Sequence, residues 1–147
     1  MPQTFIMLKP DAVRRGLKDA IIKRFEDEGI HVLKEKEVIV DEALILKHYE
    51  EVIARVNQPY FQQAILDVFV GKKVYAIILE SKSPTIIEDV RTILGATDPS
   101  QASKDSIRGQ FKDDDLKTAM AEKRIVRNLV HASDSEVSFK QEMSIWF

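Results

Sequence analysis

The sequence predicts an α+β fold in which an antiparallel sheet packs against helices. Two short apolar runs, Thr4–Leu8 and Val74–Leu79, have strand length and suit strands buried on both faces. Between such runs, apolar residues recur at helical spacing, and Gly or Pro separates the segments. A chain of 147 residues fits one compact core, so we expect a single domain over residues 1–147.

The first half of the chain contains one further predicted strand and three predicted helical segments. After Gly16, Leu17, Ala20, Ile21 and Phe25 recur at helical spacing, and Gly29 follows as a helix-ending residue. His31 to Val40 has β-branched residues at both ends around charged residues, which is typical of a strand partly open to water. Helical patterns then occupy residues 42–56 and 61–70.

The second half predicts two helices, a polar loop and a last strand before the final helix. Ile86, Val90 and Leu94 mark a helix that Ser83 would cap. Residues 96–111 are polar and turn-rich, 113–123 predict an exposed helix, and 125–130 predict a strand. A capping box starting at Ser133 predicts a short helix toward Glu142. The order reduces to a ferredoxin-like βαββαβ unit with helices on the faces of its sheet and an extended loop before the last strand.

Composition excludes several classes of function. The formal charge is −2 and the pI about 5.9, which argues against a nucleic-acid-binding module with a broad basic face. There is no Cys, so the chain has no disulfide and no thiolate ligand, and no apolar run approaches the ~20 residues that span a bilayer. The three His residues are scattered, which makes a His-cluster metal site improbable. The amino end has no basic leader, so we expect a cytoplasmic protein without membrane or nucleic-acid partners.

One histidine stands where phosphate chemistry is possible. His131 follows the last apolar run and precedes a capped helix, so its ring is expected near unpaired backbone N–H groups that favour an anion. A neutral imidazole can attack phosphorus, and Glu142 could accept a hydrogen bond from the second ring nitrogen. The competing interpretations are a packed structural histidine and a solvated surface carboxylate. Only five Gly are present, and none forms a phosphate-binding loop, so phosphate would be held by side chains and helix ends.

Four separated motifs and the chain end closely resemble nucleoside diphosphate kinases over essentially the whole chain. The segments that carry the resemblance are Thr4-Phe5-Ile6-Met7-Leu8-Lys9-Pro10-Asp11, Arg91-Thr92-Ile93-Leu94-Gly95-Ala96-Thr97-Asp98-Pro99, Ser106-Ile107-Arg108-Gly109, Asn128-Leu129-Val130-His131-Ala132-Ser133-Asp134-Ser135 and Ile145-Trp146-Phe147.

The resemblance implies a ping-pong reaction with broad base specificity. The γ-phosphoryl group of a nucleoside triphosphate, mainly ATP, would pass to His131 and then to a nucleoside diphosphate, with Mg²⁺ carried by the nucleotide phosphates rather than by protein ligands. Ser133 and Glu142 match residues that support the histidine, Lys9 would assist catalysis, and Tyr60 matches the aromatic residue on which the base stacks. The residues matching phosphate and ribose contacts are Lys9, Tyr49, Arg91, Thr97, Arg108 and Asn128. The family also implies a homo-oligomer, either a tetramer or a hexamer.

Departures from the family pattern give further expectations. Ala12 and Ala132 stand where Gly is frequent or usual, so a backbone with positive φ there would be strained. The segment between Arg108 and Asn128 is longer than the usual pattern, and its predicted helix reads as an exposed surface helix in preference to an assembly contact. Two non-catalytic alternatives remain at this point, namely a ferredoxin-like nucleotide-binding or regulatory module and an inactive scaffold used for interactions.

Overall fold

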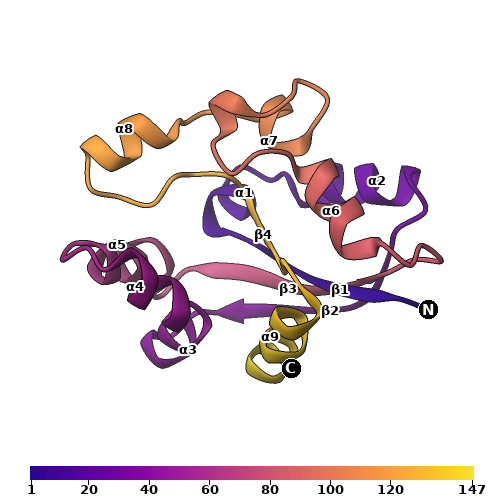
Figure 1. The fold of residues 1–147 in the computed structure, drawn as a ribbon, viewed down its shortest axis with the longest axis horizontal. Helices are drawn as coiled ribbons and strands as arrows, with labels where there is room; N and C mark the ends of the chain where they lie inside the picture. The colour runs from indigo at the N-terminus through magenta and orange to yellow at the C-terminus, as the bar shows by residue number, and fades with distance from the viewer.

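The computed structural model describes residues 1–147 and confirms the α+β fold (Figure 1). Four strands form one antiparallel sheet in the order β2-β3-β1-β4. Their bounds are β1 (Gln3–Leu8), β2 (His31–Ile39), β3 (Lys73–Glu80) and β4 (Val130–Ala132). β1 lies between β3 and β4, and its register sets Met7 opposite His131. His131 therefore lies on β4, next to the buried strand β1.

The two faces of β1 and β3 bury two separate apolar clusters, because successive side chains of a strand point to opposite faces. Ile6 and Leu8 belong to one cluster, whereas Phe5 and Met7 belong to the other. The helices that contribute buried residues to the first cluster are α1 (Pro10–Arg14), α2 (Lys18–Asp27), α6 (Ile86–Leu94) and α7 (Ile107–Gln110). Those that contribute to the second are α3 (Glu42–His48), α5 (Phe61–Phe69) and α9 (Glu136–Trp146).

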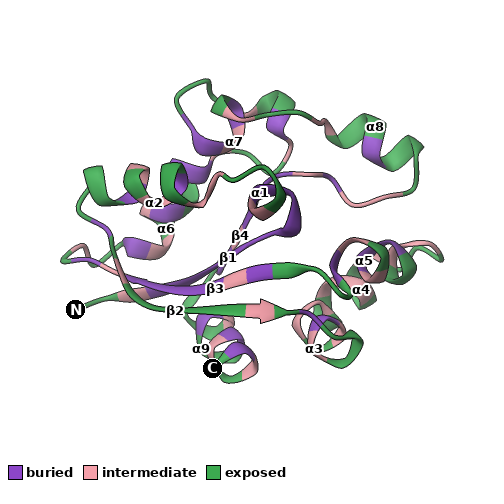
Figure 2. Ribbon diagram, turned by 180° about the vertical axis from the view of Figure 1, so that it is seen from behind, coloured by how far each residue is buried: buried purple, intermediate pink, exposed green.

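Helices thus cover both faces of the sheet, as expected (Figure 1). β2 is an edge strand, and most of its residues are exposed, as Figure 2 shows. None of the helices is both long and apolar enough to cross a membrane.

The helix predicted over residues 42–56 is two helices, α3 and α4 (Glu50–Val56). Tyr49 interrupts them with φ −97° and ψ 10°. At this break the Tyr49 ring packs against Phe69, with ring centroids 5.5 Å apart, and α4 contributes no buried residue. The periodic pattern continued through the break, but packing of one aromatic side chain into the core decided the local backbone.

The stretch before β4 differs most from the sequence prediction. The expected loop contains a short 3₁₀ turn (Pro99–Gln101) and α7, and the expected helix over 113–123 is the shorter α8 (Leu116–Ala121), capped by Asp115. The predicted strand over 125–130 was wrong, since β4 begins only at Val130. Residues 125–129 do not pair with β1. Val126 and Asn128 in this segment instead accept hydrogen bonds from Lys9 and Arg108.

Two capping predictions were also wrong. Thr85, not Ser83, is the N-cap of α6, and the Ser83 hydroxyl instead donates to Asp89 at 2.6 Å. The capping box of α9 is formed by Ser135 and Ser138 rather than by Ser133. This frees the Ser133 hydroxyl for the functional site.

Candidate active site

The predicted site residues meet at one cavity of about 680 Å³. Most of its lining residues come from α3, α4, α5, α8, β4 and α9 and from residues 124–128. In Figure 1, α8 lies above α4 and α5. The predicted residues that line it are Lys9, Tyr49, Tyr60, Arg91, Thr97, Arg108, Asn128, His131 and Glu142. Ser133 does not line it; its side chain is buried and reaches the cavity through Glu142.

His131 is held by a carboxylate. Its Nε2 lies 2.8 Å from Oε2 of Glu142, which is buried in the body of α9. An ionised carboxylate only accepts hydrogen bonds, so Nε2 carries the proton and Nδ1 keeps its lone pair. The His131 side chain is 22% exposed, which leaves it accessible from the cavity. The ring therefore offers one nucleophilic nitrogen, and the surface-carboxylate interpretation of Glu142 was wrong.

Glu142 is itself oriented by a second donor. The Ser133 hydroxyl donates to Glu142 Oε1 at 2.5 Å. The two carboxylate oxygens thus have separate partners, which fixes the plane of the carboxylate and hence that of the imidazole. The hydrogen bond that His131 makes to α9 is at Glu142, beyond the first turn of the helix, while Asp134 and Ser138 near its amino end line the same cavity.

Lys9 and Asn128 form a buried polar pair at the cavity. Lys9 Nζ donates to Asn128 Oδ1 at 2.8 Å and to the Val126 carbonyl at 3.3 Å. Asn128 Nδ2 donates to the Thr97 carbonyl at 3.0 Å, which ties in the loop after α6. Burial lowers the pKa of Lys9 to about 8, against the opposing effect of nearby Asp11. An ammonium has three donors, so one remains for a ligand.

Arg108 is anchored by three backbone carbonyls. It donates from Nη1 to Gly95 at 3.0 Å, from Nε to Asn128 at 3.1 Å and from Nη2 to Val130 at 2.6 Å. A guanidinium has five N–H donors, so two remain for an anion. Burial, followed by repulsion from Arg91, lowers the pKa of Arg108 to about 10. Both arginines remain cationic at neutral pH, and together they make this end of the cavity suited to phosphate.

An unusual backbone turn aims two of these carbonyls at Arg108. Leu129 has φ 73°, a left-handed value rare for a branched residue, and Val130 N donates to the Asn128 carbonyl at 2.8 Å. The Leu129 N–H donates to the Asp11 carboxylate at 3.1 Å, and its carbonyl accepts from Lys9 N at 2.8 Å. Such strain persists where surrounding contacts over-determine it, often at functional sites. It also explains why the last strand is shorter than predicted.

The remaining predicted residues occupy different parts of the cavity. Arg91 Nη1 donates to the Ala132 carbonyl at 3.3 Å, and Thr97 is exposed. Tyr49 packs between His48 and Phe69, and burial, together with the charge of Glu142, raises the pKa of its hydroxyl. Tyr60 lies at the start of α5, and it is only partly buried.

The helix of the long segment, α8, forms a cavity wall that sequence reasoning missed. Leu116 and Met120 line the cavity, and the Met120 side chain is 58% exposed. The helix is exposed as expected, but only Ala119 packs inward. The segments before and after α8 are tied together, because Arg124 Nη1 and Nη2 donate to the Asp114 carboxylate at 2.6 and 2.8 Å. The apolar spacing of the segment was visible in the sequence, but not the surface that it faces.

Neither alanine at the glycine positions is strained. The residues other than Gly with positive φ are Asn57, Lys123 and Leu129, so Ala12 and Ala132 both have ordinary backbone conformations. The backbone strain expected at Ala12 and Ala132 required a positive φ there, so it does not arise.

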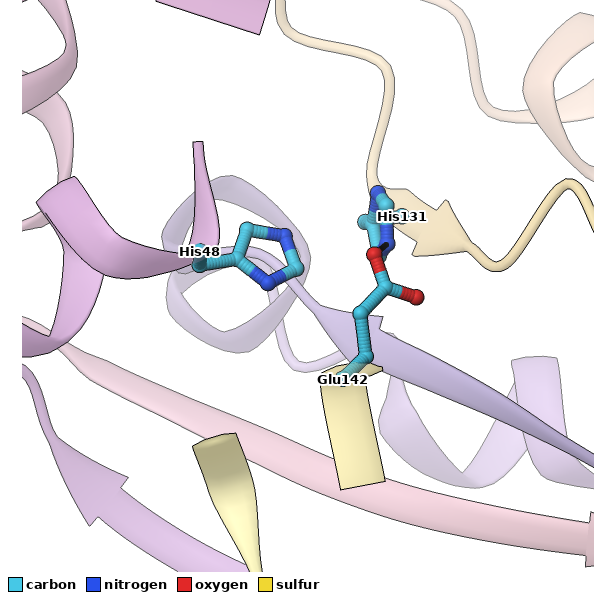
Figure 3. Close-up of side chains that lie close together, drawn as sticks. All are labelled: His48, His131 and Glu142. Carbon is cyan, nitrogen blue, oxygen red and sulfur yellow. Dashed lines mark hydrogen bonds and ion pairs between the residues drawn. The ribbon is translucent and has the colours of Figure 1, made fainter. Parts of the chain in front are cut away.

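A second histidine lies beside His131, contrary to the inference from their wide separation in the sequence. His48, His131 and Glu142 bring potential ligand atoms within 4.8 Å of one another (Figure 3). However, Trp146 Nε1 donates to His48 Nδ1 at 2.9 Å, which leaves the proton of a neutral His48 on Nε2. That protonated nitrogen cannot ligate a metal, so the cluster does not fit a resident metal ion.

Comparisons with known proteins agree with this geometry. The family model for nucleoside diphosphate kinase matches residues 2–147. The chain belongs to the nucleoside diphosphate kinase family. Nucleoside diphosphate kinase 1 of Pisum sativum is 39% identical over 145 residues, covering 99% of this chain and 87% of the relative. The Streptococcus pneumoniae nucleoside diphosphate kinase is 37% identical over 148 residues, covering both chains fully.

Solved nucleoside diphosphate kinases share the fold. The Borrelia burgdorferi enzyme, solved as a transition-state mimic with vanadate and ADP, matches with a TM-score of 0.92 and 33% identity over 99% of this chain and 86% of that chain. The Pyrobaculum aerophilum enzyme matches with a TM-score of 0.84 and 30% identity over 99% of this chain and 94% of that chain. The activity is accordingly that of a nucleoside diphosphate kinase, a phosphotransferase acting on nucleotides. This favours the enzyme over both non-catalytic alternatives.

Proposed function

We propose that the reaction proceeds by a ping-pong mechanism in which His131 carries the phosphoryl group. The observation that carries this proposal is the Ser133–Glu142–His131 chain of hydrogen bonds, which leaves Nδ1 of His131 with a free lone pair. That lone pair attacks the γ-phosphorus of a nucleoside triphosphate. The bond from phosphorus to the bridging oxygen breaks, and the diphosphate leaves with the electron pair. A terminal oxygen of a second diphosphate then attacks the phosphorus, and the electron pair of the N–P bond returns to Nδ1.

The cations of the cavity support the transferring group. Phosphoryl transfer is catalysed chiefly by positioning and by stabilisation of charge on the phosphoryl oxygens. The two free donors of Arg108, the guanidinium of Arg91 and the third donor of Lys9 are the groups we assign to this task. Thr97 and Tyr49 would add hydroxyl contacts, and Asn128, hydrogen-bonded to Lys9, would bind the ribose near its 3′-hydroxyl.

We further propose that Mg²⁺ enters as part of the nucleotide substrate. A divalent ion suits the phosphates of this class of enzyme, and Mg²⁺ prefers oxygen ligands with several waters. The His48–His131–Glu142 cluster offers it no fitting set, so the nucleotide phosphates would hold the ion. It would neutralise part of the phosphate charge.

The nucleoside base would lie between two apolar walls. Tyr60, at the N-cap of α5, and Leu116 and Met120 on α8 line the same cavity. Figure 1 shows α5 and α8 as two separate elements, one above the other. An aromatic face stacks on any base, and these residues place little hydrogen-bonding chemistry at the base edge. Broad base specificity, with ATP as the main donor, fits this arrangement. The Borrelia relative was solved with ADP, which supports the assignment.

We also propose a cytoplasmic homo-oligomer, either a tetramer or a hexamer. The exposed edge strand β2 supports assembly, because Leu33 and Ile39 on it are 43% and 61% exposed. Unpaired strand edges favour pairing with another chain. The cytoplasm supplies the nucleoside triphosphates that the reaction consumes. Light scattering on the purified protein distinguishes the two assemblies and would show a monomer if the proposal is wrong.

Labelling with γ-³²P-ATP tests the proposed intermediate. The protein should acquire an acid-labile, base-stable label that any nucleoside diphosphate removes. His131→Ala should lose the label and the transfer while still binding nucleotide, whereas Arg108→Ala should weaken both phosphate binding and rate. A folded His131→Ala variant that still turns over would show that another residue is the nucleophile.

A further inference from the structure

His48 packs against the ring of the proposed nucleophile His131 but takes no part in the proposed phosphoryl transfer. Its ring centroid lies 4.5 Å from that of His131, and the two planes meet at 82°. Tyr49, Phe5 and Trp146 surround the other sides, with centroids 4.6, 6.4 and 5.5 Å away. His48 is therefore held in one orientation by aromatic neighbours.

Trp146 decides which nitrogen of His48 carries the proton. The indole N–H is a donor only, so its 2.9 Å bond to His48 Nδ1 requires a lone pair on that nitrogen. A neutral His48 must then carry its hydrogen on Nε2. Burial, with further contributions from His131 and Lys9, lowers the pKa of His48 well below 6.5, so the ring stays neutral at physiological pH.

The Nε2–H group that results has no hydrogen-bond partner although it is buried. Polar groups left in this state cost folding free energy, so each one needs an explanation. In Figure 3 the ring nitrogen farther from the chain attachment of His48 lies on the edge that faces His131, whose ring is seen edge-on. With the perpendicular planes, this geometry is that of an N–H group directed at the face of an imidazole, a weak but real interaction.

This contact opposes one effect of Glu142. A carboxylate beside an imidazole orients it but also favours the protonated form, which has no lone pair for attack on phosphorus. The positive end of the His48 N–H dipole favours a neutral ring instead. The charged and titratable groups that face the two histidines are Glu142 from α9, Lys9 from the segment after β1, and Tyr49 at the end of α3.

We infer that His48 is a positioning residue: its Nε2–H, fixed by the bond from Trp146, holds the ring plane of His131 and favours its neutral, nucleophilic form. This inference rests on the proposed role of His131 as phosphoryl acceptor. It assigns Trp146, near the end of the chain, an indirect part in catalysis.

Two substitutions test the inference by the pH dependence of phosphorylation. Trp146→Phe keeps an aromatic ring but removes the donor, so His48 can place its proton on Nδ1 and turn a lone pair toward His131. His48→Phe keeps an aromatic edge without an N–H. In rapid-quench labelling with γ-³²P-ATP, the acid limb of the rate should move upward by roughly half a pH unit or more in both variants. The rate on the alkaline plateau should change less than about threefold.

Phe69→Leu is the matched control, because Phe69 belongs to the same apolar cluster and contacts Tyr49 but neither histidine. It should lower stability without moving the acid limb. Nitrogen-15 NMR of the imidazoles reports the tautomer directly and does not depend on catalysis. Wild-type His48 should carry its proton on Nε2, and Trp146→Phe should shift population to Nδ1.

A proton on Nδ1 of wild-type His48, or an unmoved acid limb in both folded variants, would overturn the inference. If His48→Phe fails to fold, Trp146→Phe and the NMR measurement decide alone. Failure of the proposed function looks different, since His131→Ala would then retain the label. Loss of label in His131→Ala with an unmoved acid limb would refute only the role of His48.

Discussion

Replacing Glu142 by alanine should slow phosphorylation of His131 by breaking the bond that orients its ring. The bond from His131 Nε2 to Glu142 Oε2 is 2.8 Å long, and the carboxylate is buried, so water replaces it poorly. A hydrogen bond to a charged group contributes about 1.5–3 kcal/mol. Each 1.36 kcal/mol of barrier is tenfold in rate, so if the bond is needed in the transition state the loss is roughly 10- to 150-fold.

Glu142→Gln separates charge from geometry. The amide oxygen can still accept from His131 Nε2 while the amide nitrogen faces the Ser133 hydroxyl, which then accepts. Both contacts survive but the negative charge is lost, so the rate should lie between those of wild type and Glu142→Ala. The assay is single-turnover transfer of γ-³²P to the protein at saturating nucleotide, which excludes effects on binding.

Ser133 provides the internal check on this reasoning. Its hydroxyl reaches the site only through Glu142, so Ser133→Ala should slow transfer by roughly 2- to 10-fold in wild type. It should change nothing further once Glu142 is alanine, because the shared partner is gone. A Glu142→Ala enzyme at the wild-type rate, or full additivity of the two substitutions, would refute the proposed orienting role.

Three further outcomes follow from the same geometry. Because burial lowers the pKa of Lys9 to about 8, Nζ loses its proton as the pH rises through that value, so kcat/KM should fall above about pH 8; a profile flat to about pH 10 would contradict this. Met120→Ala should raise the KM for nucleotides roughly threefold or more with kcat unchanged, whereas Val137→Ala, exposed on α9 away from the cavity, should leave KM alone. Arg124→Met should destabilise the protein by roughly 1–3 kcal/mol in thermal unfolding at pH 7, because it leaves the Asp114 carboxylate without its main partner. The bond to Arg124 holds the pKa of Asp114 below its ordinary value of 3.8, so this difference from wild type should persist above that pH and shrink as the pH falls below it.

Much of the fold could be predicted from local pattern. The apolar runs of β1 and β3 and the helical spacing of α2 and α6 are strong signals, because burial selects the same residue types wherever these elements form. The prediction was wrong where a tertiary contact overrides local preference. The break at Tyr49 and the left-handed Leu129 are both of this kind, since neither is favoured by the residue that adopts it.

In the candidate active site, too, some features follow from local sequence pattern and others from tertiary packing. Resemblance in motif order was enough to name residues that line one cavity, and the residue pattern was enough to select His131 as the candidate for phosphate chemistry. The packing of the elements brought His48 and Trp146 to that histidine and placed α8 at the same cavity as Tyr60, because contacts between residues far apart in the chain depend on how the elements pack. Spacing along a chain carries no information about which edge of a ring faces another, and that orientation is what decides which nitrogen keeps its lone pair.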